Sequence, residues 1–175
     1  DKAFADFKIA DVLMILYRLI WDEFCGWFLE AVKPSEGKMA PSSLETVKSH
    51  FEELLRMLHP FMPFITEELW QLLTEGEEDR TICTAAYPAK RDWSEEAVQK
   101  FENTREAITL IRAQRSQKGM SPKEALDVTY SGDAHFCEDI LSKLANLQSL
   151  NAVSSSPEGM SSIRVKQMEF YLDLG

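Results

Sequence analysis

The sequence predicts a mainly α protein, with a helix bundle over residues 1–120 and a small α+β unit over residues 123–175. Apolar residues recur at helical spacing in long stretches up to Gly119. Gly119 and Pro122 then come close together, which is typical of a helix end. Beyond Pro122 the pattern changes to short alternating segments, which favour strands.

The first predicted helix runs from Phe4 to Val32. Its charged residues gather on about half of the circumference, so the other half is available for a core. Lys33 and Pro34 end it, because the residue before a proline is pushed out of the helical region. The charges of Arg18 and Asp22 interrupt this segment, the most apolar of the chain, so no membrane span is expected.

A second helix is expected to begin at Ser42 or Ser43, whose hydroxyls can cap its first turn. Its apolar residues recur every three or four positions as far as Leu58. Pro60 and Pro63 then force a bend, since each removes a backbone donor and clashes with the preceding turn. We call residues 59–66 the proline elbow.

A third helix follows the proline elbow, and Thr66 is its predicted N-cap. Large apolar side chains beside a forced bend pack one helix against another. We therefore expect Phe64 and Trp70 to be core residues. Glu67 and Glu68 fall in the first turn, where carboxylates favour a helix N-terminus, so a structural role is predicted for both.

The remaining elements follow a polar segment at 74–92. Ser94 is the predicted cap of a long helix that ends near Gly119. The α+β unit is then expected to hold one helix packed on a small sheet. Its predicted elements are a strand at Ala125–Tyr130, a helix at Ala134–Leu147 and strands at Leu150–Ser154, Ile163–Val165 and Met168–Leu174.

Charge is unevenly distributed along the chain. The 175 residues contain 19 Lys and Arg against 29 Asp and Glu, a net charge of −10. Such an acidic total argues against indiscriminate nucleic-acid binding but leaves room for a local basic surface. Residues 100–124 provide one, with six basic and three acidic residues.

Arg105, Arg112 and Arg115 stand seven and three residues apart, so they project from nearly the same helix face, with Lys118 beyond them. A row of guanidinium groups can follow phosphates, because its planar donors match phosphate oxygens. The alternative is a solvated face with internal ion pairs.

An aromatic group on the first helix, Trp21 to Phe28, is the second candidate surface. Its spacing favours core packing. Alternatively, Trp21 and Trp27 leave an exposed edge that stacks on an unpaired base.

Catalytic and metal-binding patterns are absent from the sequence. The three cysteines are isolated, odd in number and without paired spacing, so the sequence supports neither a disulfide framework nor a zinc motif and indicates a reducing compartment. His59 has no ligand or catalytic partner at a recognisable spacing, so a hydrogen-bonded structural role is predicted. Phosphate-binding glycine loops and nucleophile motifs are missing too, so we expect no catalysis, cofactor or metal in this chain.

One family resemblance is specific. The runs IWDEFCGWFLE at 20–30, KP at 33–34 and LHPFMPFITEELW at 58–70 resemble the anticodon-binding domain of valyl-tRNA synthetases. IRAQR at 111–115 resembles the family's Ile-Arg-x-x-Arg, and residues 125–175 are similar to its small α+β unit. The proline elbow is shared loosely with leucyl and isoleucyl enzymes, whereas Glu-Phe-Cys with Lys-Pro indicates the valyl one.

The sequence departs from the family at Gly26, where acidic residues are frequent, and at Phe28, where tyrosine is frequent. The family's His-Ile-Gly-His-like and Lys-Met-Ser-Lys-Ser-like catalytic signatures, its editing domain, the opening helix of the bundle and the terminal coiled coil have no counterpart. The chain is therefore expected to be part of a longer protein.

The resemblance implies a helix bundle of the class I synthetase anticodon-binding type. It implies a parent enzyme, cytoplasmic, that joins valine to tRNA with ATP and magnesium. This chain would bind the anticodon stem and loop. It would be non-catalytic and monomeric, and the catalytic domain of the same protein would lie beside it. A leucyl or isoleucyl equivalent and a helical protein-interaction domain remain open. The candidate tRNA-binding residues are Arg105, Arg112, Arg115, Lys118, Trp21 and Trp27.

Overall fold

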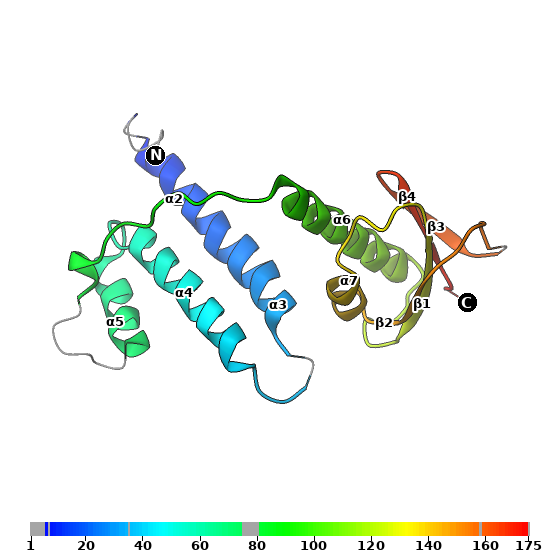
Figure 1. Ribbon diagram of the computed structural model, residues 1–175, viewed down its shortest axis with the longest axis horizontal. Coiled ribbons are helices and arrows are strands. Elements are labelled where there is room, and N and C mark those ends of the chain that lie inside the picture. The colour runs from blue at the N-terminus through cyan, green and yellow to red at the C-terminus, as the bar shows by residue number, and fades with distance from the viewer. Residues whose placement is uncertain (1–5, 7, 35, 75–80, 158, 175) are drawn as a thin grey trace. The chain divides into compact units, whose positions relative to one another are not determined.

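The computed structural model describes residues 6, 8–34, 36–74, 81–157 and 159–174. The chain divides into two compact units, residues 1–91 and 92–175 (Figure 1). The first unit is helical in its described part. Its elements are α2 (Ile9–Arg18), η1 (Leu19–Phe28), α3 (Leu29–Val32), α4 (Pro41–Leu58), α5 (Pro63–Leu73) and η2 (Ile82–Thr84).

The helix predicted from Phe4 to Val32 is confirmed from Ile9 onward, and residues 4, 5 and 7 lie outside the described residues. Its middle, η1, is a π-helix, a wider turn that the apolar spacing did not predict. Phe24 lies buried within η1 and stacks on Phe51 of α4, with ring centroids 5.8 Å apart. This stacked pair packs the first helical run against α4.

Both helices that flank the proline elbow begin at a proline. Pro41 and Pro63 occupy the first helical turns of α4 and α5, because a proline's fixed φ suits that position and its missing N–H is not needed there. The predicted cap at Thr66 is therefore wrong. Thr66 lies inside the first turn of α5, fully buried, and its hydroxyl donates to the carbonyl of Met62 at 2.8 Å.

The core beside the proline elbow contains Trp70, which is 3% exposed, as predicted. Phe64 was also expected there, and that prediction is wrong because its side chain is 90% exposed. Six residues separate the two, which places them about 120° apart around a helix. Trp70 faces the core, with buried Leu55 and Ile82.

The second unit begins with α6 (Glu95–Gln117). The predicted cap is confirmed, since Ser94 Oγ accepts from the amide of Ala97 at 3.2 Å. The predicted end is confirmed too. Gly119 has a φ of +69°, a value that favours glycine, and the next amide, of Met120, donates back to the carbonyl of Arg115 at 3.0 Å.

A four-stranded sheet with one helix follows, which confirms the predicted small α+β unit. The strand order is β2-β1-β4-β3, in which β1 and β2 are parallel and are joined through α7. Both other pairings are antiparallel. The bounds are β1 (Leu126–Ser131), α7 (Glu138–Leu144), β2 (Leu147–Ala152), β3 (Ser161–Val165) and β4 (Met168–Leu172).

The core of the second unit lies between α6 and the sheet. Ile108 and Ile111 of α6 are fully buried, as are Val128 of β1 and Phe170 of β4. Because α6 packs against α7 and β3, the compact unit starts at Asp92. This grouping differs from the predicted domains 1–120 and 123–175, which assigned α6 to the helix bundle.

Candidate nucleic-acid interface

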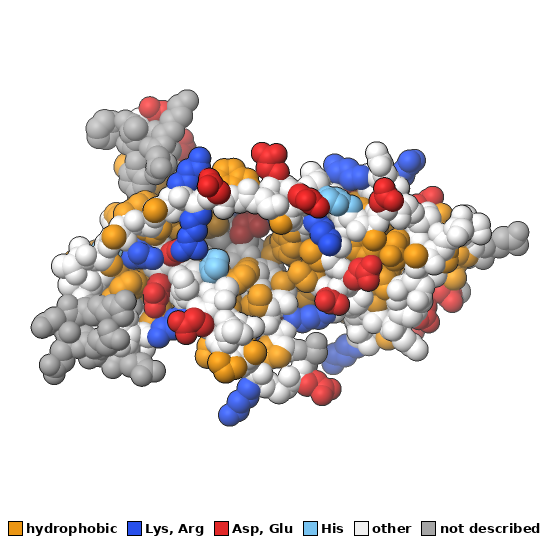
Figure 2. All heavy atoms as spheres, in the orientation of Figure 1, with side chains coloured by type: hydrophobic (Ala, Val, Ile, Leu, Met, Phe, Trp, Pro, Cys, Tyr) orange, Lys and Arg blue, Asp and Glu red, His pale blue; other side chains and the backbone are white. Residues whose placement is uncertain are grey.

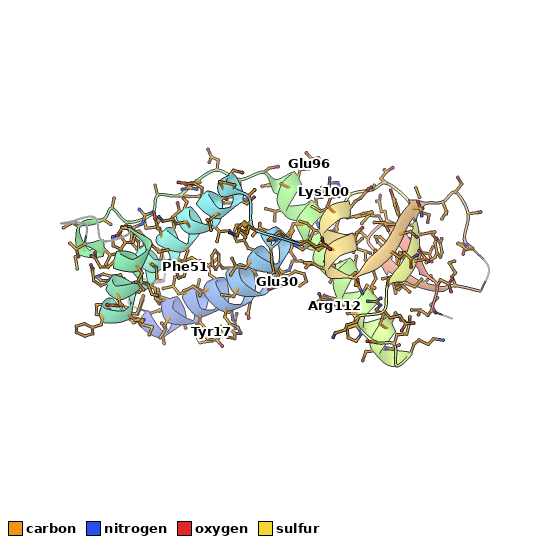
Figure 3. The ribbon with its side chains drawn as sticks, turned by 90° about the horizontal axis from the view of Figure 1, so that it is seen from below. Tyr17, Glu30, Phe51, Glu96, Lys100 and Arg112 are labelled. Carbon is orange, nitrogen blue, oxygen red and sulfur yellow. The ribbon has the colours of Figure 1, made fainter. Side chains whose placement is uncertain are left out.

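The three arginines predicted to share one face of α6, and Lys118 beyond them, lie in different surroundings along the helix. Arg105 is half-buried and pairs with Glu102 at 3.0 Å. Arg112 is exposed, and one of its Nη atoms donates to the carbonyl of Leu144 at 2.7 Å (Figure 3). Lys118 is exposed at the C-cap position of α6. The structure thus keeps Arg112 and Lys118 at the surface.

Arg115 is the exception, since it is only 4% exposed. Its guanidinium donates to the carbonyl of Ala145 at 2.9 Å and to that of Glu124, and lies 3.4 Å from that of Asn146. Burial lowers the pKa of Arg115, and the charge of Glu124 partly opposes this shift. In this structure these donors hold the second unit together, and phosphate binding by Arg115 stays a prediction.

Arg112 and Arg115 both donate hydrogen bonds to carbonyls at the C-terminal end of α7. The last carbonyls of a helix lack partners within it and carry a partial negative charge. Two arginines from α6 satisfy these carbonyls. Periodicity placed the two side chains on one face, but it gave no sign of what that face would meet.

A cavity of 610 Å³ opens beside these arginines. Ser116, Gly119 and Asn146 contribute to its lining along with both arginines. Sequence reasoning did not single out Ser116 or Asn146. Asn146 reaches the cavity only because the chain returns past α6 after α7, a contact that no local pattern signals.

The aromatic group on the first helical run divides between core and surface. Phe24 is buried, Trp27 is half-buried and Trp21 is 64% exposed. Tyr17, one turn before Trp21, is also exposed (Figure 3). We call Tyr17 and Trp21 the aromatic surface. Core packing thus holds for Phe24, whereas Trp21 has the exposed face that base stacking requires.

His59 in the proline elbow and Glu67 directly after it have structural contacts, as predicted for both. His59 Nδ1 lies 2.7 Å from Thr66 Oγ1. Glu67 accepts from Gln71 at 2.7 Å, from Thr81 Oγ1 at 2.8 Å and from the amide of Ile82 at 3.1 Å. The hydrogen bond from Gln71 contributes most to lowering the pKa of Glu67, with further contributions from Thr81, Ile82 and the charge of His59, while burial opposes them.

Replacing Glu67 by glutamine is expected to lower the free energy of unfolding at pH 7 by about 1 kcal/mol, because a carboxylate binds these donors more strongly than an amide. The lowered pKa means that this stabilisation is present above the ordinary glutamate value of about 4.3 and is lost as pH falls through the native value. Urea unfolding at pH 7 and pH 3 measures the difference.

The control is Glu68→Gln, since Glu68 is exposed on the same turn. It should change the free energy of unfolding by less than about 0.5 kcal/mol at either pH. A Glu67→Gln deficit that stays the same at pH 3 would show that the carboxylate charge is not its source.

The described residues contain no group of three or more His, Cys, Asp or Glu side chains placed to hold a metal ion. None of their helices is both long and apolar enough to cross a membrane.

Comparison with known proteins gives concordant matches. Residues 1–130 match the family described as the anticodon-binding domain of tRNA ligase. The chain is 34% identical over 178 residues to the valine–tRNA ligase of Christiangramia forsetii, a match that covers 99% of this chain and 20% of that protein. It is 37% identical over 175 residues to the valine–tRNA ligase of Bacteroides fragilis, a match that covers 98% of this chain and 20% of that protein. With the Aquifex aeolicus valine–tRNA ligase it shares 30% identity over 198 residues, covering 99% of this chain and 17% of that protein. The chain spans about a fifth of the first two relatives.

Proposed function

This chain belongs to the family of anticodon-binding domains of tRNA ligases, and from that membership we propose that it binds the anticodon stem and loop of a tRNA. The predicted resemblance to valyl-tRNA synthetases is confirmed by the valine–tRNA ligase relatives. We therefore propose a valine-accepting tRNA as the ligand. The match over residues 1–130 is the observation that carries the proposal.

The basic surface of the second unit, Arg112 and Lys118, supports phosphate binding. Both side chains are exposed, and an arginine has five N–H donors, of which Arg112 uses one on the carbonyl of Leu144. The adjacent cavity of 610 Å³ leaves room for a phosphate or sugar beside Arg112. Since the whole chain carries −10, attraction to RNA depends on short-range contacts of this kind.

The aromatic surface of the first unit supports base contact, because unpaired bases stack on exposed aromatic rings. It also favours a second candidate function. Large apolar side chains are exposed in the first unit, where hydrophobic atoms lie among charged groups (Figure 2). Exposed apolar surfaces also dock protein. The exposed apolar residues of the first unit include Met14, Ile15, Tyr17, Trp21, Phe64 and Leu72.

The double variant Arg112→Ala with Lys118→Ala tests RNA binding. We expect weaker binding to a tRNA with a valine anticodon at low salt. If each residue neutralises one phosphate, the slope of log affinity against log salt should flatten by about 1.5 units. The ratio of affinities for valine and non-valine anticodons should stay constant, because phosphate contacts carry no base information. Filter binding over a salt series measures both quantities.

The matched control removes the same charge elsewhere, with Lys8→Ala and Lys38→Ala, both exposed in the first unit. It should leave the slope nearly unchanged. Should the Arg112 and Lys118 variant keep the parent slope while folded, the basic surface is only a solvated face. Trp21→Ala then decides between the remaining candidates: a loss of about tenfold in tRNA affinity supports base stacking, and no loss favours protein docking.

For the whole ligase we propose attachment of valine to tRNA with ATP and Mg²⁺. The described residues of this chain offer no three-ligand metal cluster, so we assign no step of that chemistry to them. A cytoplasmic location and a monomeric state remain predictions.

A further inference from the structure

A cysteine, a histidine and a threonine meet at the proline elbow of the first unit. Cys83 is exposed on η2, and its Sγ lies 3.3 Å from Nε2 of His59. The other ring nitrogen of His59, Nδ1, lies 2.7 Å from Thr66 Oγ1. In the chain His59 and Cys83 stand 24 residues apart, so no spacing in the sequence indicated the pair.

The hydrogen bonds of Thr66 determine which nitrogen of His59 carries the proton. The Thr66 hydroxyl has one proton, and it donates to the carbonyl of Met62 at 2.8 Å, with that of Pro63 at 3.2 Å. Toward His59 the hydroxyl oxygen can therefore only accept, so Nδ1 must be the donor. In the neutral ring this leaves the lone pair of Nε2 facing the Cys83 thiol.

Glu67 connects the segments that carry His59 and Cys83. Glu67 lies one residue after Thr66 and interacts electrostatically with His59. Its carboxylate also accepts from Thr81 and Ile82, the two residues that precede Cys83. The same carboxylate thus helps to hold the cysteine next to the ring.

We propose that Cys83 is a base-activated thiol, a site of modification by hydroperoxides and other soft electrophiles, with His59 as the base and Thr66 as the residue that positions His59. A nucleophile, a base and a third group that orients the base form the general pattern of an activated side chain. This inference is independent of tRNA binding.

The step with a hydroperoxide is balanced as follows. Nε2 of His59 takes the thiol proton, and the Cys83 sulfur attacks one peroxide oxygen. The S–O bond forms as the O–O bond breaks, so sulfur is oxidised to a sulfenic acid and the peroxide is reduced. The imidazolium returns its proton to the leaving oxygen, which departs as water when the oxidant is hydrogen peroxide.

Cys25 and Cys137 serve as internal references. Both are half-buried, and neither has a hydrogen bond to a histidine in the described part of the structure. We expect Cys83 to react faster than either in the same molecule.

The test alkylates the 175-residue chain with limiting iodoacetamide at pH 7 and measures the rate at each cysteine by peptide mass spectrometry. His59→Gln should slow Cys83 about tenfold. The ceiling is about thirtyfold, because an ordinary thiol is only a few per cent thiolate at this pH. Hydrogen peroxide followed by a sulfenic-acid trap should give the same order of reactivity.

A matched pair at Thr66 isolates the positioning role. Thr66→Ser keeps the hydroxyl and should retain the rate at Cys83, whereas Thr66→Val removes the acceptor for Nδ1 and should slow it about threefold, less than loss of the base itself. Added imidazole should restore reactivity in His59→Ala, which a merely structural histidine would not allow.

The rate at Cys25 reports on the folding of the first unit, since it rises if a variant unfolds there, and Cys137 in the second unit is the constant reference. Where a His59 variant unfolds, the Thr66 pair decides. The proposal is overturned if Cys83 reacts no faster than the two references. It is also overturned if folded His59→Gln keeps the parent rate, or if Thr66→Val and Thr66→Ser react equally fast.

Discussion

Replacing Trp70 by alanine is expected to lower the free energy of unfolding of the first unit by about 3 to 5 kcal/mol. Trp70 is 3% exposed and packs with Leu55 and Ile82 beside the proline elbow. Removing the indole leaves a cavity that α4, α5 and η2 cannot close without moving. Urea unfolding followed by circular dichroism measures the loss.

Phe64→Ala is the matched control on the same helix. Its ring is 90% exposed, so truncation should cost less than about 0.5 kcal/mol. A loss below about 1 kcal/mol for Trp70→Ala would show that Trp70 is peripheral. Equal losses for the two variants would mean that the face of α5 opposite Trp70 is also packed.

The sequence predicted most elements because their signals are local. Ser94 caps α6 and Gly119 ends it through contacts within one or two helical turns, so composition and spacing sufficed. Thr66 failed because two local signals competed. A threonine favours a cap, but Pro63 suits the first helical position better, and the N-cap of α5 is therefore Met62, four residues before the predicted cap.

The error at Phe64 and the different grouping of α6 have another origin. Hydrophobicity identifies residues that can be buried, but which helix face is buried depends on where the neighbouring element lies. The same limit applies to α6, whose apolar residues suit a helix bundle as well as a sheet. Only the position of α7 and β3 assigns this helix to the second unit.

The candidate site was predictable to a similar degree. Periodicity correctly placed Arg112 and Arg115 on one helix face, but the carbonyls they meet lie about 30 residues further along the chain. His59 and Cys83 were each read as solitary because their contact is made by tertiary structure. Sequence spacing indicates contacts within one helix or strand, whereas these contacts join residues of different elements.

Replacing Arg115 by alanine is expected to destabilise the second unit by about 3 kcal/mol. The change leaves the buried carbonyl of Ala145 without its donor, and a buried acceptor without a partner costs about 1 to 3 kcal/mol. The carbonyl of Glu124 loses one donor and keeps the other, Asn146 Nδ2. Arg112→Ala should cost less than about 1 kcal/mol, since water can replace its exposed guanidinium at the carbonyl of Leu144. Urea unfolding, with hydrogen exchange of the α7 and β2 amides, measures both.

Arg115→Lys refines this prediction. A lysine keeps the charge but has a single ammonium, which cannot reach carbonyls from two segments as the planar guanidinium does. It should therefore recover only part of the lost stability. In tRNA binding, folded Arg112→Ala is expected to flatten the salt dependence, whereas Arg115→Ala should weaken binding only as far as it unfolds the second unit. An Arg115→Ala variant with full stability and a reduced salt slope would contradict this division and return Arg115 to the RNA-contacting residues.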